Sequence, residues 1–410
     1  MAAYTIANLP YGVITTKDHS CKRCAVAFED FAIDIAQLHQ DGFFKNIPDL
    51  SSDIFAAGNW NAFASLPPDV RRAFRTRLRS GIETGDVRRA FLPFSEVKNH
   101  LPMRTENFSD FYCSLEHHKN CSEIFNLPIK PSWYVIPSVY NGRTSSLVVS
   151  GTDFHRPYGV YAGFGKYEGA TLAPESHMDF EVEMGVWLSK PVPRNQRLNI
   201  DGAKDHIFGL TLLNDWSARQ IQGYEMAPLG PFHSKGTATT VSSWIVPIEA
   251  LEASSCATKT KQEPAPPPHL TWPEDNTATF DIDITLQLLR DGKSYMICET
   301  NLNELHWTPF QQITHLASAG ESVLVGDVFG TGTISSPRRN GNGEKTGIGC
   351  LMERSLPSAR LSSLPSDLID TFLKDGDEIL MQAWARDKHT GEVILGFGDC
   401  RGKVLPAIDP

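Results

Sequence analysis

The 410-residue sequence predicts a mainly β fold with some α+β elements, divided between a small N-terminal unit, residues 1–100, and a large unit, residues 101–410. The main observation is that segments in which apolar and polar residues alternate recur after residue 100, with turn residues between them. Domains typically contain roughly 100–200 residues, so this length indicates two or three. Hydrophobic residues make up 41% of the chain, which is enough for a large core.

The N-terminal unit is expected to combine short strands with one helix. Residues 24–38 mix apolar, acidic and β-branched residues, which indicates short strands of a small barrel. A helix is predicted from Ser65, near its N-cap, to Gly81 just past its end. Pro67 and Pro68 fit its first turn, and Asp69 lies near its positive end.

The large unit is expected to be rich in strands. One helix is predicted over residues 304–320, and residues 254–277, rich in Pro, Ser and Thr, read as an exposed loop. Strands are expected on both sides of that loop, so it is not a domain linker. The alternating segments are 145–151, 178–189, 206–215, 242–251, 280–292 and 378–387.

Charge and cysteine content narrow the class of protein. The formal net charge of −10 argues against nucleic acid and anionic membranes as partners. The chain shows no secretory leader pattern and no run of about 18 apolar residues, so no membrane span is expected. Eight scattered cysteines are too few for a disulfide framework and fit a reducing, cytoplasmic compartment.

Several motifs carry side chains that could take part in chemistry. On a strand, Glu181 and Glu183 point to the same face, although a half-exposed strand would show the same pattern. Asp215 ends a predicted strand and could cap the following helix. On that helix Arg219 and Gln222 share one face, near the carboxylate, and could stabilise an anion.

Other candidates are weaker when taken alone. Lys235 lies in a loop of small residues that lacks the phosphate-loop pattern, and Thr333 follows a glycine-rich turn at a strand end. Asp110, Tyr112 and His117 lie within eight residues of one another, and such clusters are usually incidental.

Together these motifs resemble the fumarylacetoacetase family, in the family's order and over nearly the whole chain. The resemblance implies a small SH3-like N-terminal barrel, a large domain with a rolled mixed β-sheet, and a homodimer. It rests on NLPYGV (8–13), DFYCSLEH (110–117), VVSGTDFHRP (148–157), DFEVEM (179–184), NDWSARQIQ (214–222), GTIS (332–335) and GFGDCRGKVLPA (396–407).

The resemblance also implies roles for individual residues. Four carboxylates, hard ligands suited to Mg²⁺ and/or Ca²⁺, would bind a metal. An imidazole would act as general base with a carboxylate behind it. The implied set is Asp110, Glu181, Glu183 and Asp215 as ligands, with Lys235 and Thr239 beside the metal; His117 as base, oriented by Glu353; Arg219, Gln222 and Lys235 as oxyanion donors; and Tyr112, Tyr140 and Thr333 as substrate contacts.

Two substrate-binding positions depart from the family pattern. Asn126 stands where the family has an arginine, and Met226 where it has a tyrosine. Asn141 replaces a histidine nearby. Asparagine provides neither the charge nor the two-pronged hydrogen bonding of arginine to a carboxylate. We therefore expect the reaction type to be retained and the substrate to differ.

The function expected is hydrolysis of a C–C bond in a fumarylacetoacetate-like 1,3-dicarbonyl acid, with a small diketo acid as the partner. The role would be in tyrosine and phenylalanine catabolism or in specialised metabolism. A decarboxylase, tautomerase or cyclase is the alternative, but His117 and Glu353 favour a step with activated water. A non-catalytic binding protein is a third reading, and four intact carboxylates argue against it.

Overall fold

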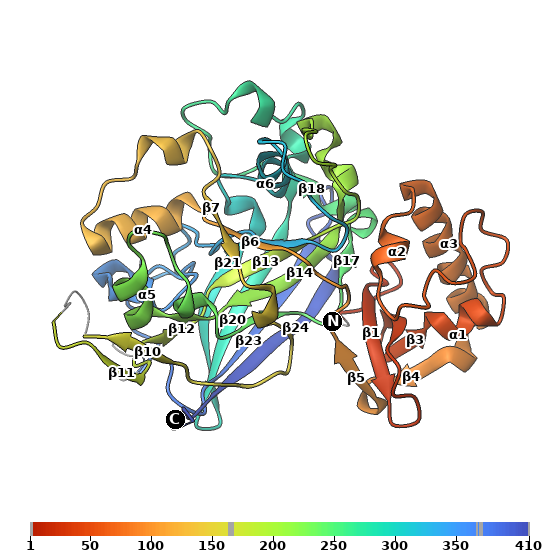
Figure 1. Cartoon of the computed structure of the whole chain (residues 1–410), viewed down its shortest axis with the longest axis horizontal. Helices are drawn as coiled ribbons and strands as arrows, with labels where there is room; N and C mark the ends of the chain where they lie inside the picture. Colours follow the sequence, from red (N-terminus) through yellow and green to blue (C-terminus); the bar gives the residue numbers. More distant parts are fainter. Residues whose placement is uncertain (1–2, 163–167, 366–367, 369–371, 409–410) are drawn as a thin grey trace.

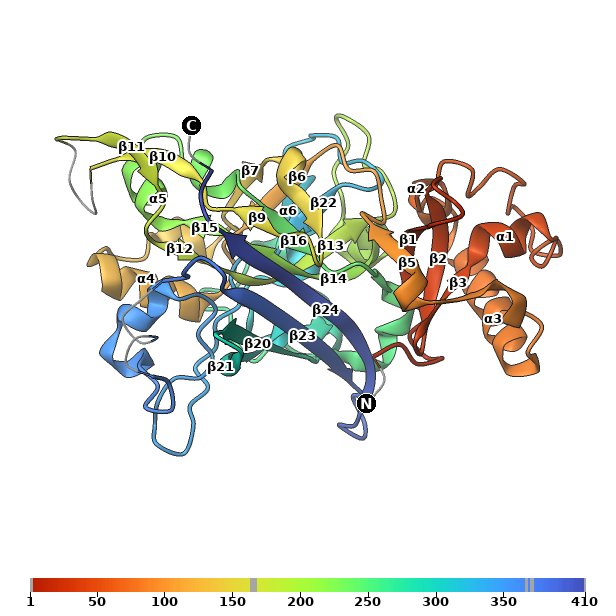
Figure 2. The ribbon, with the colours of Figure 1, turned by 90° about the horizontal axis from the view of Figure 1, so that it is seen from below.

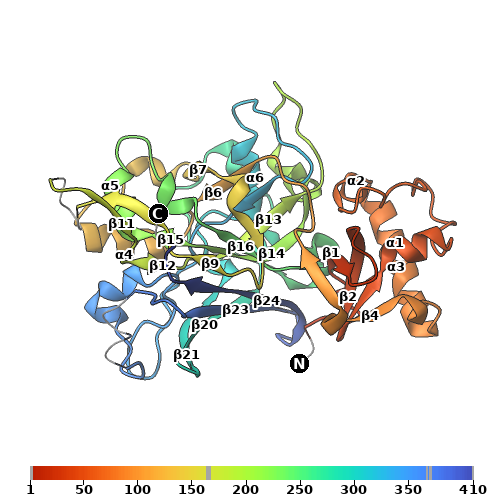
Figure 3. The same cartoon turned by 60° about the horizontal axis from the view of Figure 1, so that its bottom comes forward.

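The computed structural model describes residues 3–162, 168–365, 368 and 372–408, and its N-terminal unit is built on a five-stranded antiparallel sheet (Figure 1). Three helices lie beside this sheet (Figure 3), and two of them contact the large unit: Asn61 donates to the Val325 carbonyl at 3.0 Å, and Arg71 pairs with Glu249 at 2.9 Å. The sheet order is β4-β3-β2-β1-β5. Its strands are β1 Tyr11–Thr16, β2 Arg23–Phe28, β3 Phe31–Asp34, β4 Phe91–Pro93 and β5 Val97–His100, and the helices are α1 Ile35–Gln40, α2 Asn61–Ala64 and α3 Pro68–Thr84.

Both local predictions for this unit need correction at their ends. The strands end at Asp34, because its side chain accepts the N–H of Gln37 at 2.9 Å and starts α1. Helix α3 continues past Gly81 to Thr84 and is closed by Gly85, which has a φ of 81°. Gly81 serves close packing instead, because a Cβ there would lie 2.4 Å from the ring of Phe43.

The large unit is mainly β, as expected, and its centre is an eight-stranded mixed sheet. The sheet order is β7-β6-β22-β13-β14-β16-β8, with β17 paired to β14 at one side. The pairs β22–β6 and β16–β8 are parallel, and the other pairs are antiparallel. The strands are β6 Phe108–Phe111, β7 Val139–Gly142, β8 Leu147–Val149, β13 Val182–Leu188, β14 Ile207–Asp215, β16 Thr239–Val241, β17 Val246–Pro247 and β22 Val328–Gly330.

A second sheet packs across the first, and its long strands β23 and β24 are seen running side by side in Figure 2. Burial alternates along β20 and β23, so one face is covered. Its order is β21-β20-β23-β24-β9, with β9 Phe154–His155, β20 Ile282–Arg290, β21 Lys293–Asn301, β23 Glu378–Arg386 and β24 Val393–Leu405. Two-stranded pairs join β10 Tyr158–Tyr161 with β11 Thr171–Pro174, β12 Met178–Asp179 with β15 Ser217–Ala218, and β18 Ser255–Cys256 with β19 Thr279–Phe280.

Among the described residues, the large unit also contains the helices α4 Leu115–Phe125, α5 Arg219–Glu225 and α6 Pro309–Leu316. The helix predicted over 304–320 is thus shorter, because a capping box of Thr308 and Gln311 starts it late. The strand predicted over 242–251 is wrong except at β17. Pro247 lacks the N–H that a continued ladder needs. Among the described residues, no helix has the length and apolar character to cross a bilayer.

The central sheet is buried on both faces, so β13 and β14 have no solvent-exposed side. The N-terminal unit covers one of these faces. Tyr11 stacks between Trp60, at 4.4 Å between ring centroids, and Phe208 of β14, at 5.3 Å. The same apolar cluster includes Leu213 and Val241 of the central sheet. The two units therefore share one core behind the strands that carry Asp215 and Thr239.

We predict that Phe208→Ala lowers the free energy of unfolding by about 3–5 kcal/mol, because it opens a cavity at this shared core. Urea unfolding followed by tryptophan fluorescence measures the change. Phe232→Ala is the control, since that ring is 57% exposed and its removal is expected to cost within about 0.5 kcal/mol. Equal losses in the two variants would contradict the shared core.

Candidate active site

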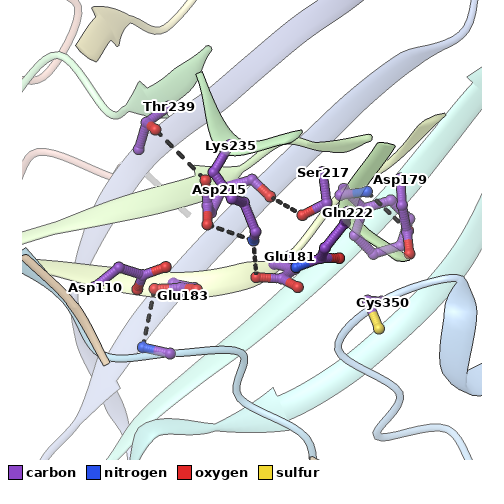
Figure 4. A network of polar contacts seen from close by, with 12 residues as sticks. Asp110, Asp179, Glu181, Glu183, Asp215, Ser217, Gln222, Lys235, Thr239 and Cys350 are labelled. Atoms are coloured by element: carbon purple, nitrogen blue, oxygen red, sulfur yellow. Dashed lines mark hydrogen bonds and ion pairs between the residues drawn. The ribbon is translucent and has the colours of Figure 1, made fainter. Parts of the chain in front are cut away.

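Four buried carboxylates converge at one end of the central sheet. Asp110 lies on β6, Glu183 on β13, Glu181 just before β13, and Asp215 at the end of β14. One oxygen from each lies within 4.8 Å of the others (Figure 4). The sequence placed the Glu181–Glu183 pair on one face, and the structure brings the pair together with Asp110 and Asp215. Asp215 does not cap α5, whose N-cap is Ala218 without a side-chain hydrogen bond.

The space between these carboxylates is kept open by a glycine turn after β22. A Cβ on Gly330 would lie 2.5 Å from Glu183 Oε2 and 2.7 Å from Asp110 Oδ1. Gly332 has a φ of 80° and donates its N–H to Glu183 Oε2 at 2.9 Å. Within the described residues, neither Asp110 Oδ1 nor Glu183 Oε1 has a hydrogen-bond partner although both are buried. Orphaned oxygens in an oxygen-only cradle fit a hard divalent cation.

One lysine and one tyrosine bridge the carboxylates. Lys235, at the end of a short 3-10 helix, contacts Glu181 Oε2 at 2.6 Å and Asp215 Oδ2 at 2.5 Å. The Tyr140 hydroxyl lies 2.7 Å from Asp110 Oδ2 and 3.2 Å from Asp215 Oδ2. Thr239, on β16 beside Asp215, is more distant, with its hydroxyl 3.5 Å from Asp215 Oδ1.

A second cation flanks the cluster on the other side. Arg219 donates from Nε to Asp179 Oδ2 and from Nη1 to Glu181 Oε1, both at 2.8 Å. Its Nη1 also donates to Gln222 Oε1 at 3.0 Å, which confirms that the two side chains share one helical face. Asp179 points away from the cluster, and its Oδ1 accepts the N–H of Leu351 at 2.7 Å. In the described part of the chain, Arg219 Nη2 is buried without a partner.

The carboxylates fall into two electrostatic classes. Burial raises the pKa of Asp110 and of Glu183 well above the usual range. Repulsion from Asp215 adds to the shift of Asp110, and repulsion from Asp110 adds to the shift of Glu183. Burial also acts on Glu181, but Lys235 and Arg219 outweigh it and lower its pKa to about 2. Of these carboxylates and Asp179, only Asp179, Glu181 and Asp215 contact the two cationic side chains among the described residues, and a bound cation would relieve the excess negative charge.

His117 and Glu353 form a buried pair near this cluster. His117 Nδ1 lies 3.1 Å from Glu353 Oε2, as the resemblance implied. Glu353 also accepts hydrogen bonds from Asn120 at 2.6 Å and from Ser335 at 2.8 Å. Burial would raise the pKa of Glu353, but His117 and these donors hold it below the usual value. Glu353 is therefore ionised and fixed toward the ring.

A further chain of contacts supports this pair. Lys345 Nζ lies 2.8 Å from Asn120 Oδ1 and 2.8 Å from Glu116 Oε1, which turns the Asn120 amide nitrogen toward Glu353. No role for Asn120, Ser335 or Lys345 is indicated by the motifs taken one by one. Asn120 lies three residues after His117 on α4, a spacing that could have indicated it. Lys345 lies in a distant loop, and the sequence gives no signal for it.

The structure brings only some of the predicted substrate contacts close to the base. Tyr112 lies beside the base, with its ring centroid 5.2 Å from that of His117, and Thr333 is buried next to Gly349. Asn126 instead is exposed at the C-cap of α4, in the left-handed region with a φ of 52°. Met226 is 46% exposed at the C-cap of α5.

A cavity of about 500 Å³ lies next to the carboxylates, with Tyr140 and Lys235 in its wall. Asn141 lines it too, so the third departure from the family pattern borders this space. The guanidinium of Arg143, also in the wall, lies 4.7 Å from the ring centre of Phe232. This space could admit a small polar ligand to the carboxylate cluster.

The fold and site define a class: β-rich proteins with a buried cluster of four carboxylates, which could hold a cation, beside a His–Glu pair. Sequence models of known families identify the family to which the chain belongs. The model described as "Fumarylacetoacetate (FAA) hydrolase C-terminal" matches residues 106–405, and that described as "Fumarylacetoacetase N-terminal" matches residues 7–102. The chain belongs to the fumarylacetoacetate hydrolase family, and it is a hydrolase acting on C–C bonds.

Curated relatives match over almost their whole length. Fumarylacetoacetases from Arabidopsis thaliana, Caenorhabditis elegans and Homo sapiens are 35%, 36% and 34% identical to this chain. The matches cover 98%, 98% and 99% of this chain and 96%, 97% and 97% of the relatives.

Solved structures share the fold. A fumarylacetoacetate hydrolase from Exiguobacterium antarcticum has a TM-score of 0.53 at 13% identity and covers 97% of this chain and 99% of its own. A maleylpyruvate hydrolase from Sphingobium sp. SYK-6 has a TM-score of 0.52 at 15% identity, covering 97% and 100%.

We predict that divalent cations stabilise the protein more at pH 8 than at pH 5.5. The folded state favours the protonated forms of Asp110 and Glu183, because folding raises the pKa of both carboxyl groups. Their contribution to stability is therefore present at low pH and is lost as pH rises through those values. A cation that binds the ionised forms reverses this loss. At 100 times its Kd it would add about 2.7 kcal/mol.

Thermal unfolding with and without Mg²⁺ or Ca²⁺ at the two pH values measures the effect. Glu183→Gln should abolish the stabilisation. The control Asp283→Asn should keep it, because that carboxylate pairs with Arg386 outside the cluster. A cation effect that is equal at both pH values, or that persists in Glu183→Gln, would count against the site.

Proposed function

We propose that this protein hydrolyses a C–C bond in a fumarylacetoacetate-like 1,3-dicarbonyl acid. The observation that carries the proposal is the His117–Glu353 pair beside four buried carboxylates. A base held by a carboxylate is what activation of water needs, whereas decarboxylation needs no activated water. The names of the curated relatives support fumarylacetoacetate as the type of substrate.

Asp110, Glu181, Glu183 and Asp215 would hold Mg²⁺ and/or Ca²⁺. Such a cation, when bound, lowers the energy of the enolate that leaves when the C–C bond breaks. Lys235 keeps Glu181 ionised and turns Glu181 and Asp215 toward the same space, since it contacts both. Tyr140 and Thr239 fix the orientation of Asp110 and Asp215 in the same way.

His117 would activate the water. Its Nδ1 faces Glu353, so Nε2 is left to accept a proton as the water oxygen bonds to the carbonyl carbon. The C–C bond then breaks, its electron pair forms the enolate, and the proton on His117 can return to the enolate carbon. The products are two carboxylic acids if the cleaved carbonyl belongs to an acyl group.

Three donors would stabilise the tetrahedral oxyanion. Arg219 has a buried Nη2 that no described group satisfies. Gln222 accepts from Arg219 through Oε1, so its amide N–H groups point elsewhere. Lys235 supplies a positive charge close to both. Loss of one such donor typically costs about 10²–10³ in kcat.

Family membership also supports finer proposals. The protein would be cytoplasmic and homodimeric, and it would act in tyrosine and phenylalanine catabolism or in a specialised pathway. Incubation with Mg²⁺ and a panel of diketo acids, followed by mass spectrometry, tests the reaction. Cleavage with uptake of one water supports hydrolysis. Loss of CO₂, or an isomer of unchanged mass, would support the alternative reactions.

We predict that His117→Ala lowers kcat by at least about 10²-fold, the lower range for a general base. His118 is the matched control, because it neighbours His117 but packs against Trp133, with ring centroids 4.9 Å apart. Burial lowers the pKa of His118 to about 4, so it stays neutral. Near-normal turnover in His117→Ala, with loss in His118→Ala, would reverse the assignment.

The pH profile gives a second measure of the same base. Burial favours the neutral ring, but Cys121 and Glu353 outweigh it and raise the pKa of His117 well above its usual value. Only the neutral ring accepts a proton, so kcat/KM should rise with pH through this raised pKa. The rising limb should vanish in His117→Ala.

We predict weak activity on fumarylacetoacetate itself and a gain in Asn126→Arg/Met226→Tyr. A charge-assisted hydrogen bond is worth roughly 1.5–3 kcal/mol, so kcat/KM should rise about 10- to 150-fold. Lys119 and Lys130 are exposed and could replace the arginine from another direction. Wild-type kcat/KM above about 10⁴ M⁻¹s⁻¹, the ordinary enzyme range, would contradict a changed substrate.

A further inference from the structure

Two thiols flank the buried His117–Glu353 pair and have no part in the hydrolysis proposed above. Cys121 lies one turn after His117 on α4, and its Sγ is 3.6 Å from Nε2 and 4.0 Å from Nδ1 of the ring. Cys350 Sγ lies 3.4 Å from Glu353 Oε2. All four side chains are buried. Figure 4 places Cys350 on a loop below the carboxylate network.

Three of these four side chains are close enough together to share one small cation. A tetrahedral zinc site has metal–ligand distances of about 2.0–2.3 Å, so its ligand atoms lie roughly 3.3–3.8 Å apart. His117 Nδ1 and Glu353 Oε2 are 3.1 Å apart, slightly below this range, and Glu353 Oε2 and Cys350 Sγ are 3.4 Å apart, within it. Ligand atoms of His117, Cys350 and Glu353 all lie within 4.8 Å of one another. Cys121 is not part of this group, and its Sγ lies 4.0 Å from Nδ1.

We propose that His117, Cys350 and Glu353 form a second cation site, which takes Zn²⁺ or another thiophilic ion and shuts off hydrolysis. A thiolate, an imidazole and a carboxylate are ligands of the type that zinc prefers, and three protein ligands leave the fourth position to water. The four-carboxylate cluster is purely hard and suits Mg²⁺ or Ca²⁺. Ligand chemistry therefore separates the two sites although they lie close together.

The inhibition follows from where the protons lie once the ion is bound. The Cys350 thiol releases its proton to solvent when it binds the ion. His117 binds through Nδ1, which places the ring proton on Nε2, so the ring can no longer accept a proton from water. The ion also replaces the ring as the partner of Glu353. This part of the inference rests on His117 as the base, whereas the coordination itself does not.

The activity test uses the full-length protein with saturating Mg²⁺. Zn²⁺ should inhibit the wild type, and excess Mg²⁺ should not relieve the inhibition. Cys350→Ser keeps a donor to Glu353 but removes the soft ligand. It should raise the half-inhibiting Zn²⁺ concentration at least about tenfold, the lower range for altered metal sites. Cys256→Ser removes a half-buried thiol outside the pair and should leave inhibition unchanged.

A spectroscopic test is independent of turnover. Co²⁺ added to the Mg²⁺-loaded protein should give thiolate-to-metal charge-transfer absorption, which Cys350→Ser should abolish. A wild type without this band, or unchanged Zn²⁺ inhibition in Cys350→Ser, would overturn the site. A band with unaffected turnover would instead overturn His117 as the base and with it the inhibitory role. A folding defect in Cys350→Ser leaves the wild-type spectrum decisive.

Discussion

The repulsion among four buried carboxylates is the constraint on which the rest of the site depends. Two unit charges about 4 Å apart interact by roughly 4 kcal/mol at an effective dielectric constant of 20. Asp110, Glu181, Glu183 and Asp215 lie within such distances, in a place where water cannot screen them. Lys235 compensates part of this charge. Burial and mutual repulsion still raise the pKa of Asp110 and Glu183, so Lys235 does not compensate all of the negative charge.

The sheet is built to hold these charges together. Neighbouring strands β6, β22, β13, β14 and β16 each end at the site, and β22 contributes Gly330, where any side chain would collide with two carboxylates. The back of the same strands is covered by the aromatic core around Tyr11 and Phe208. The N-terminal unit therefore makes no described contact with the carboxylates. It nevertheless shields from water the strands on which the carboxylates lie.

The chemistry of the site could be predicted from the sequence, because each motif carries its own reactive side chains. The placement of the carboxylates depends on strand register, which the spacing of Glu181 and Glu183 indicates only locally. Gly330, Asn120 and Lys345 act through contacts between segments far apart in the sequence, and no local pattern records them. The predicted end of α3 at Gly81 is wrong for a related reason. Gly81 allows close packing against Phe43, and the helix ends later.

Asn126 illustrates two constraints on one position. The sequence showed only the loss of an arginine, whereas the structure shows a left-handed helix cap, which asparagine tolerates better than most residues. The observed residue therefore has a structural reason as well as a consequence for the substrate.

The most direct test of the account is the position of a bound cation. Crystals soaked in Mn²⁺, an oxygen-preferring ion visible by anomalous scattering, would locate it. We expect one strong peak between Asp110, Glu181, Glu183 and Asp215, within about 2.0–2.6 Å of their oxygens. A peak elsewhere, with the four carboxylates bound only to Lys235, Tyr140 and solvent, would contradict the account.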